Sequence, residues 1–587
     1  MLSNFAHLLY TNYIPSNEET GEIKQLLIDP QVQLSNLNEE IERIQSILND
    51  LFLKRNTLQE TINAHRALIS KPRTLPHDVL QEIFVHCLPT SLNAAMNAKE
   101  APILLGRICS TWRTSAYSTP QLWATLHIPM PGDRDLSTTL LHERMSTTAC
   151  DMLFERIDLA RIQAVEEWLN RSGNCPLSIS YHQVQNKIPW DVASGFEECI
   201  DPIMKILLSR SRQWANMNFY LPELYDEQFS RLSIDDVPNL RSISLTATTS
   251  LNPWSEAVDI PILHHPTIHS LSLFPLRKKD LFSSTGKSWS HLTNLSFNCE
   301  TRAPISWLPL SAVLSALRQC PLLTKFWLVM HEPGGQNPVD MLMGPSFTLR
   351  YLRSLTISVN VDLQEFLEFL VLPALSSCAF QFQSRSRNDL AALYPSINPF
   401  LSRVGNQISA LTLASSRSTS QVDFLKFASY TPHLRRVYIT SSQWFITPMY
   451  NSPSASWNIS PNLLLNDDIL EALTPSLEDG SSIACIWPKL EVFECDVDVD
   501  VHETKVLDFL ETRNQKTAIG IAQIKRVKFS FSRAVPQMSD HSARAWEARI
   551  AKLHEDGIIM DFSWVKAHQK SIFSAWYGIE MTRRDRE

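Results

Sequence analysis

Between Leu34 and Ile69 the apolar residues recur in alternating steps of three and four, which places them along one side of an α-helix. Arg55 and His65 occupy the two breaks in this series. The pattern predicts a single heptad helix over residues 34–70, about 54 Å long at 1.5 Å per residue. The seam residues are Leu34, Leu37, Ile41, Ile44, Leu48, Leu51, Leu58, Ile62 and Ile69.

Two arrangements satisfy an apolar seam of this length. The helix forms a coiled coil with another helix, such as that of a second copy of the chain, or it packs on the protein's own body. Self-association through residues 34–69 is therefore one of two open interpretations. Pro72 ends the helix, and residues 1–33 have no persistent period, so we expect a loosely ordered leader before it.

Further along the chain, an octet of the form P-x-L-x-x-L-x-L recurs ten times. The copies are PNLRSISL (238–245), PTIHSLSL (266–273), SHLTNLSF (290–297), PLLTKFWL (321–328), RYLRSLTI (350–357), PALSSCAF (373–380), NQISALTL (406–413), PHLRRVYI (432–439), PKLEVFEC (488–495) and a last, degenerate copy, QIKRVKFS (523–530). The last two apolar positions are two residues apart, so both point to the same side of a short strand.

The spacing of the octets defines a repeat. The first apolar positions of successive octets lie 23 to 34 residues apart, except for a step of 56 between Leu434 and Leu490, which indicates a degenerate or interrupted copy. A unit of this length with this octet resembles the leucine-rich repeat. The resemblance implies a curved solenoid in which each unit buries its apolar face on its neighbours, with a parallel sheet on the concave side and helices on the convex side.

The expected fold class is α/β, with a long N-terminal helix, a small all-α module and a repeat solenoid. The boundaries are a leader (1–33), the heptad helix (34–70), the helical module (71–128), a linker and helix (129–165), the solenoid (166–535) and a C-terminal cap and tail (536–587). We expect a helix near Leu153–Asn170, a first strand over 175–181, and a capping helix and strand over 541–562 separated by Gly557.

Composition narrows the class of protein. Hydrophobic residues make up 44% of the chain and charged residues 19%, which is too apolar for a disordered protein. The net charge of −8, without a long basic run, argues against nucleic-acid binding. No apolar run is long enough for a membrane span, and the ten cysteines form no C-x-x-C pair. We therefore expect an intracellular protein with reduced thiols, in the cytoplasm or nucleus.

The segment 75–128 contains three short helical motifs. LPHDVLQEIFVHCL (75–88) starts with Pro76 at the first turn of a helix and then presents a broad apolar face. APILLGRICSTWRTSAYS follows from Ala101, and TPQLWATLHI follows from Thr119. Together they resemble the F-box, whose pattern is L-P-x-[DE]-[VLI]-L-x-x-I-F, then [VI]-C-x-x-W-[RK], then P-x-L-W. The stretch TSLNAAMNAKE (90–100) makes the gap between the first two motifs longer than in the compact F-box.

The combination of heptad helix, F-box-like module and repeats is similar to the large F-box families of mushroom-forming fungi. In that family the module docks on a Skp-family adaptor, which joins a cullin–RING ubiquitin ligase. About half of the apolar residues in such a module form its own core, so each has a purely structural interpretation as well. The resemblance implies that the adaptor-binding residues are Leu75, Pro76, Val79, Leu80, Ile83, Phe84, Ile108, Cys109, Trp112 and Trp123.

Other chemistry is not supported. His264, His265 and His269 have no Cys or carboxylate partner for a zinc site, and the DVDVDVH run has neither the Gly nor the Glu of a calcium loop. No P-loop, Rossmann glycine run, G-x-S-x-G or H-E-x-x-H occurs. We expect no enzyme activity, no catalytic residues, no metal and no cofactor.

Two hypotheses about function remain. The chain is a non-catalytic substrate receptor of an SCF-type ligase, or it is a ligase-independent scaffold that self-associates through the heptad helix. In either case the repeats would bind an unknown target protein. Candidate target-binding residues on the concave side, chosen because their positions are outward on the predicted strands, are Arg241, His269, Lys325, Arg353, Arg436 and Tyr438.

Overall fold

The computed structural model divides the chain into two units, Met1–Glu82 and Ile83–Glu587. It describes residues 5, 9, 11–69, 75–90, 92–130, 147–183, 202–221, 226–247, 260–274, 289–298, 310–330, 344–359, 363–382, 390–415, 421–441, 465–478, 482–497, 501–515, 521–531 and 540–564. Helix α2 (His77–His86) contains the boundary between the two units.

The first unit consists mainly of one helix, α1 (Asn17–Leu68). It begins at a capping box, in which the Glu19 N–H donates to Ser16 Oγ at 3.3 Å and the Ser16 N–H donates to the Glu19 carboxylate at 2.8 Å. The structure therefore corrects the expected loose leader, because residues 17–33 are helical. The S-N-E-E sequence at 16–19 is the signal for this start. The eight seam residues within α1, and Ile69 just beyond its end, are all exposed.

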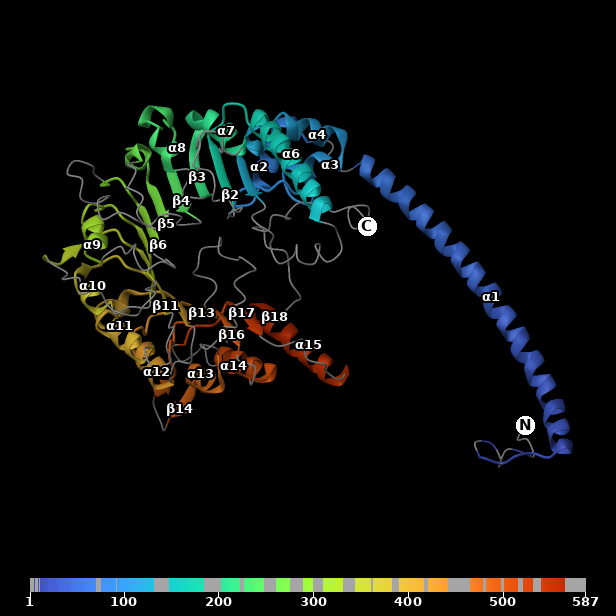
Figure 1. The fold of residues 1–587 in the computed structure, drawn as a ribbon. Coiled ribbons are helices and arrows are strands. Elements are labelled where there is room, and N and C mark those ends of the chain that lie inside the picture. Colours follow the sequence, from blue (N-terminus) through green and yellow to red (C-terminus); the bar gives the residue numbers. More distant parts are fainter. Residues whose placement is uncertain are drawn as a thin grey trace. The chain divides into compact units, whose positions relative to one another are not determined.

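The second unit is built on a sheet of 14 strands, in which every neighbouring pair is parallel (Figure 1). Its strands, in spatial order, are β1 (Thr125–Met130), β2 (Leu177–Gln183), β3 (Trp214–Leu221), β4 (Ser242–Ala247), β5 (Ser270–Phe274), β6 (Asn294–Asn298), β7 (Lys325–Met330), β9 (Ser354–Val359), β11 (Ser377–Phe382), β12 (Ala410–Ser415), β13 (Arg436–Ser441), β16 (Val492–Val497), β17 (Arg526–Phe531) and β18 (Ile559–Trp564). Two further sheets have two strands each. One pairs β8 (Phe347–Thr348) with β10 (Leu370–Val371), and the other pairs β14 (Ser476–Glu478) with β15 (Ser482–Ala484).

Helices lie along one side of the sheet, and those from α6 onward connect its strands (Figure 1). They are α3 (Ile103–Ile108), α4 (Ser110–Tyr117), α6 (Thr147–Arg171), α7 (Pro202–Ser209), α8 (Asp226–Ser230), α9 (Leu310–Arg318), α10 (Gln364–Glu368), α11 (Leu390–Val404), α12 (Gln421–Ser429), α13 (Asp467–Leu473), α14 (Glu503–Gln515) and α15 (Asp540–Glu555). Helix α6 corresponds to the helix expected near Leu153–Asn170. The α/β class and the large parallel sheet agree with a solenoid-like body.

Each of the ten octets ends on a strand of this sheet, and the strands follow one another in chain order. The first apolar position of every octet is at most 1% exposed: Leu240, Ile268, Leu292, Leu323, Leu352, Leu375, Ile408, Leu434, Leu490 and Ile524. The apolar residue three positions later is also buried in every copy. Stacking of equivalent apolar positions on neighbouring strands therefore forms the continuous core of the unit.

The long step between Leu434 and Leu490 has a specific structural cause. Strands β13 and β16 pair directly, with Val437 opposite Phe493, so no described strand of the sheet comes between them. Helix α13 and the β14–β15 pair lie in the intervening sequence. This step is thus an insertion between two neighbouring repeats.

The sheet also begins earlier than expected. Its first strand is β1, which comes from the last residues of the segment assigned to the all-α module, and not the strand predicted at 175–181. The alternation of buried Leu126 and Ile128 in TLHIPM is the pattern of a strand. At the other end, α15, Gly557 with φ of 89° and β18 form the predicted cap.

A buried arginine links the insertion between β13 and β16 to helix α14. Arg513 of α14 is fully buried and donates to the Leu473 carbonyl oxygen at 2.8 Å and to the Trp487 carbonyl oxygen at 2.6 Å. Leu473 ends α13, so this guanidinium satisfies one of the carbonyl groups that a helix end leaves without a partner. Burial lowers the pKa of Arg513, while its contact with Cys485 opposes that shift.

We predict that Arg513→Met destabilises the chain, because two carbonyl oxygens lose a buried donor at about 1–3 kcal/mol each. The loss should appear as a lower urea midpoint with the repeat sheet still forming at low denaturant. Arg526→Met is the matched control, since Arg526 is exposed and should change the free energy of unfolding by less than about 0.5 kcal/mol. Equal midpoints for the two variants would contradict the structural role given to Arg513.

Candidate functional site

Helix α2 has two different apolar faces. Leu80 is 3% exposed and Phe84 is 0% exposed, so this face lies in the core. Val79 and Ile83 are 41% and 42% exposed, and they are one helical turn apart on the neighbouring face. The broad apolar face that the sequence indicates thus divides into a buried stripe and a solvent-facing stripe.

Helices α3 and α4 repeat this division. Leu105 is buried on α3, whereas Leu104 and Ile108, four residues apart, are 42% and 54% exposed. Cys109 separates the two helices in an extended conformation, and its Sγ accepts the Trp112 N–H at 3.4 Å as the N-cap of α4. An exposed apolar pair therefore remains on α3 after the module has formed its own core.

Aromatic contacts hold the module together. The rings of Phe84 and Trp112 lie 4.9 Å apart, which joins the end of α2 to α4. Trp123 is 1% exposed, donates through Nε1 to the Ala116 carbonyl oxygen at 2.9 Å, and packs edge-on against Trp168 of α6. These contacts stabilise the module itself.

The longer gap at 90–100 contacts the edge strand of the sheet. The His127 N–H of β1 donates to the Ala94 carbonyl oxygen at 2.7 Å, and Ala95 forms a parallel bridge with His127. Asn93 also exchanges hydrogen bonds with Ser178 and Ser180 of β2. The added residues therefore attach the module to the sheet, and the Phe84–Trp112 contact forms despite them.

The structure separates the ten residues predicted to bind an adaptor. Leu80, Phe84 and Trp123 lie in the core, and Leu75, Cys109 and Trp112 are half-buried. The exposed ones are Pro76, Val79, Ile83 and Ile108. Leu104 is an exposed apolar residue that the prediction missed, although its position four residues before Ile108 is a sequence signal that could have found it.

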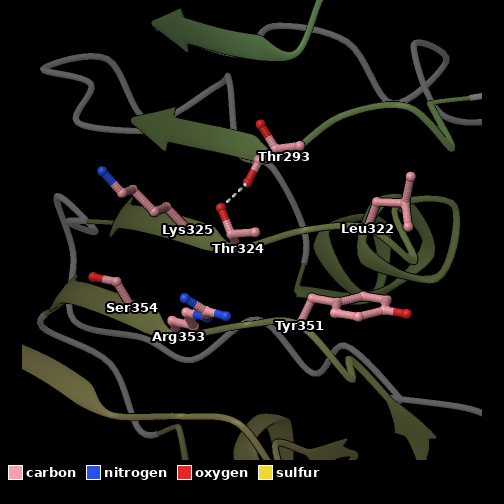
Figure 2. A pocket seen from close by; sticks show the side chains of 7 residues that line it. All are labelled: Thr293, Leu322, Thr324, Lys325, Tyr351, Arg353 and Ser354. Atoms are coloured by element: carbon pink, nitrogen blue, oxygen red, sulfur yellow. Dashed lines mark hydrogen bonds between the residues drawn. The ribbon is translucent and has the colours of Figure 1, made fainter.

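A second candidate site is a groove at the start of strands β6, β7 and β9, with a volume of about 490 Å³ (Figure 2). Its lining residues are Thr293, Leu322, Thr324, Lys325, Tyr351, Arg353 and Ser354. Two cationic side chains thus stand beside hydroxyl groups, with an exposed leucine and an exposed tyrosine at the other end.

The strand register fixes this arrangement. Lys325 pairs with Asn294 on one side and with Ser354 on the other, and Arg353 immediately precedes Ser354. The Thr324 hydroxyl donates to the Thr293 carbonyl oxygen at 3.0 Å, which ties the neighbouring loops together. Neither Lys325 nor Arg353 forms an ion pair with any residue in the described part of the chain. The groove can therefore offer two positive charges to an anionic ligand.

Two of the six predicted target-binding residues belong to this groove. Lys325 and Arg353 line the groove, whereas the other four do not. Arg241, His269 and Arg353 each lie one residue before the strand of their octet, and all three are exposed. Arg436 begins β13, and Tyr438 lies half-buried within it. Leu322 and Tyr351, which the prediction missed, occupy the second position of their octets.

The same described ranges contain no group of three His, Cys, Asp or Glu side chains that could hold a metal ion. Among their helices, none has the length and apolar character needed to cross a membrane.

Comparison with known proteins does not assign the chain to a family. No protein-family model matches it, and no curated protein matches it. Among solved structures, the crystal structure of a Bacteroides fragilis protein matches at 13% sequence identity, covering 59% of this chain and 74% of that chain. Its TM-score of 0.26 carries no argument about fold or function.

Proposed function

We propose that this chain is a non-catalytic substrate receptor of an SCF-type cullin–RING ubiquitin ligase. In this proposal residues 75–128 act as an F-box that docks on a Skp-family adaptor, and the leucine-rich-repeat-like body holds a target protein. A separate enzyme of the complex would transfer ubiquitin, so the chain itself contributes proximity alone.

The observation that carries the proposal is the apolar surface that the module's own packing leaves exposed on α2 and α3. Ile83, Leu104 and Ile108 are each more than 40% exposed, although Phe84 and Leu105 beside them are buried. A fully buried Leu or Ile contributes about 1.5–3 kcal/mol, so covering three such side chains could stabilise a partner interface by several kcal/mol. Core formation explains the buried stripe but gives no reason for the exposed one.

The groove supports the second half of the proposal. Lys325 and Arg353 favour a negatively charged group, and Leu322 and Tyr351 favour an apolar side chain next to it. The target class that fits is a peptide segment with acidic residues beside a large apolar residue.

A second candidate function is a scaffold that self-associates through α1 without joining a ligase. The observation in its favour is the heptad seam of α1, which is exposed along its whole length. The two candidates differ in one property, because only the first requires binding to the adaptor.

We predict that Ile83→Glu with Ile108→Glu abolishes co-purification with a Skp-family adaptor, because both charges would enter an apolar interface. Leu80 and Phe84 are unsuitable for this test, since they belong to the core and their loss would unfold the module. Ile234→Glu is the matched control: it makes the same change at an exposed isoleucine far along the chain.

Unchanged thermal melting of the double variant would show that the fold is intact. Retention of the adaptor by wild type and by Ile234→Glu, with loss from the double variant, is the expected result. If folded wild type does not bind the adaptor, the receptor function is wrong.

We further predict that Lys325→Glu with Arg353→Glu lowers affinity for acidic peptides containing leucine or phenylalanine by at least tenfold. Each charge-assisted hydrogen bond is worth about 1.5–3 kcal/mol, so the loss of two exceeds a factor of ten. Fluorescence anisotropy with peptides of fixed composition would measure it. Arg350→Glu with Lys426→Glu is the control, because it changes net charge equally at exposed positions outside the groove. Equal loss in both variants would indicate a nonspecific effect of charge and would argue against the groove.

A further inference from the structure

The residues of the α1 seam indicate how two copies of the helix would pair. In heptad notation, position a is occupied by Leu34, Ile41, Leu48, Arg55 and Ile62, and position d by Leu37, Ile44, Leu51, Leu58 and His65. All of these residues are exposed on α1. The single strong cation in the seam, Arg55, therefore decides between possible pairings.

A parallel pair in register is unfavourable at this residue. It would place Arg55 directly against Arg55 of the second copy, because a positions face each other in a parallel two-stranded coiled coil. It would also bring Glu40 and Lys54, which occupy g positions, next to Gln45 and Gln59 of the second copy. A parallel pair would therefore bury two Arg55 guanidinium groups against each other, and it would not bring Glu40 next to Lys54.

We propose that α1 forms an antiparallel coiled coil with α1 of a second copy of this chain, centred near Ser46. In an antiparallel pair, a positions of one helix lie in layers with d positions of the other. Centring at Ser46 gives the layers Leu34–Leu58, Leu37–Arg55, Ile41–Leu51 and Ile44–Leu48, each of which occurs twice by symmetry. Every layer except the one with Arg55 is wholly aliphatic.

Charge complementarity selects this register. Glu40 of one copy lies beside Lys54 of the other at the g positions, and Arg55 of the other copy borders the same carboxylate. Within one helix, Arg43 already donates to Glu40 at 2.8 Å, which lowers the pKa of that carboxyl and keeps it ionised. The pairing thus places two cations of the second copy beside a carboxylate that is held charged.

Shifting the pair by one heptad in either direction removes this match. Arg55 would then border Ile47 or Gln33 of the second copy, and Glu40 would face no cation. The guanidinium of Arg55 lies 4.9 Å over the Phe52 ring of its own helix, so its charge sits at the rim of the seam while its aliphatic stem covers the apolar layer.

The proposed pair also accommodates Pro30, which lies within α1. Pro30 occupies a d position and faces Ile62 beyond the last of the four layers, so the central stretch of 34–58 contains no proline. At 1.5 Å per residue, the antiparallel arrangement would set the two Leu68 ends about 66 Å apart along the axis. A parallel pair would bring them together. Adaptor docking plays no part in this inference, so either can fail without the other.

The test uses two full-length variants, Glu40→Lys and Lys54→Glu, studied by sedimentation velocity. Each alone should dissociate at least tenfold more readily than wild type, since like charges would meet at both g contacts of its homodimer. Their mixture should recover dimers of wild-type affinity with twice the 66.9 kDa chain mass. In that heterodimer the lysine introduced at position 40 meets the glutamate introduced at position 54, and the native pair of Glu40 with Lys54 remains. Glu39→Lys, the same charge change at the neighbouring outer position, should dimerise like wild type.

Disulfide trapping gives a second readout of orientation. Ile47 residues of the two copies adjoin across the symmetry axis only in the proposed register, so Ile47→Cys should trap dimers above the wild-type background of native cysteines. Leu48→Cys should not, because position 48 meets itself only in a parallel pair. Three results would each overturn the proposal. They are a monomeric wild type, homodimers of both charge variants that form as readily as wild type, and preferential trapping through Leu48→Cys.

Discussion

The rest of the second unit depends on the stacking of one buried aliphatic residue per repeat. Leu323, for example, lies between Leu292 and Leu352 in neighbouring octets, and all three are fully buried. No single repeat can bury this residue alone, because its strand has partners only in the repeats on either side. This constraint fixes the parallel register, and the register in turn brings Lys325 beside Ser354 and Arg353 in the groove. The same stacking of neighbouring repeats that forms the core therefore also positions the residues of the candidate target site.

The helical module forms its own core and still leaves apolar side chains exposed on its surface. Phe84, Trp112 and Trp123 complete its interior and connect it to α6, while residues 93–95 attach it to the first two strands. Ile83, Leu104 and Ile108 remain more than 40% exposed. The proposed receptor would therefore present a rigid docking helix pair on one end of a continuous sheet, which suits a function based on holding two proteins near each other.

Sequence periodicity predicted the repeats well because each octet must satisfy both strand alternation and stacking. It predicted residues of the module less well, since helical spacing alone cannot tell which of two adjacent apolar stripes is covered: Val79 and Leu80 both fit an apolar face, and only packing against other elements buries Leu80. The start of α1 was missed because its signal is the local cap at Ser16 and Glu19 and not a heptad. Strand β1 was missed because Leu126 and Ile128 also fit the end of a helical motif.

Hydrogen-exchange mass spectrometry of the full chain, with and without a Skp-family adaptor, tests the central claim most directly. Docking on the exposed stripe should slow amide exchange in peptides covering α2 and α3, residues 77–108, while the strands β4 to β17 exchange at unchanged rates. The proposed adaptor would cover the outer face of those helices and would not contact the repeats. Unchanged exchange over 77–108 at saturating adaptor, or protection confined to the repeats, would contradict the receptor function.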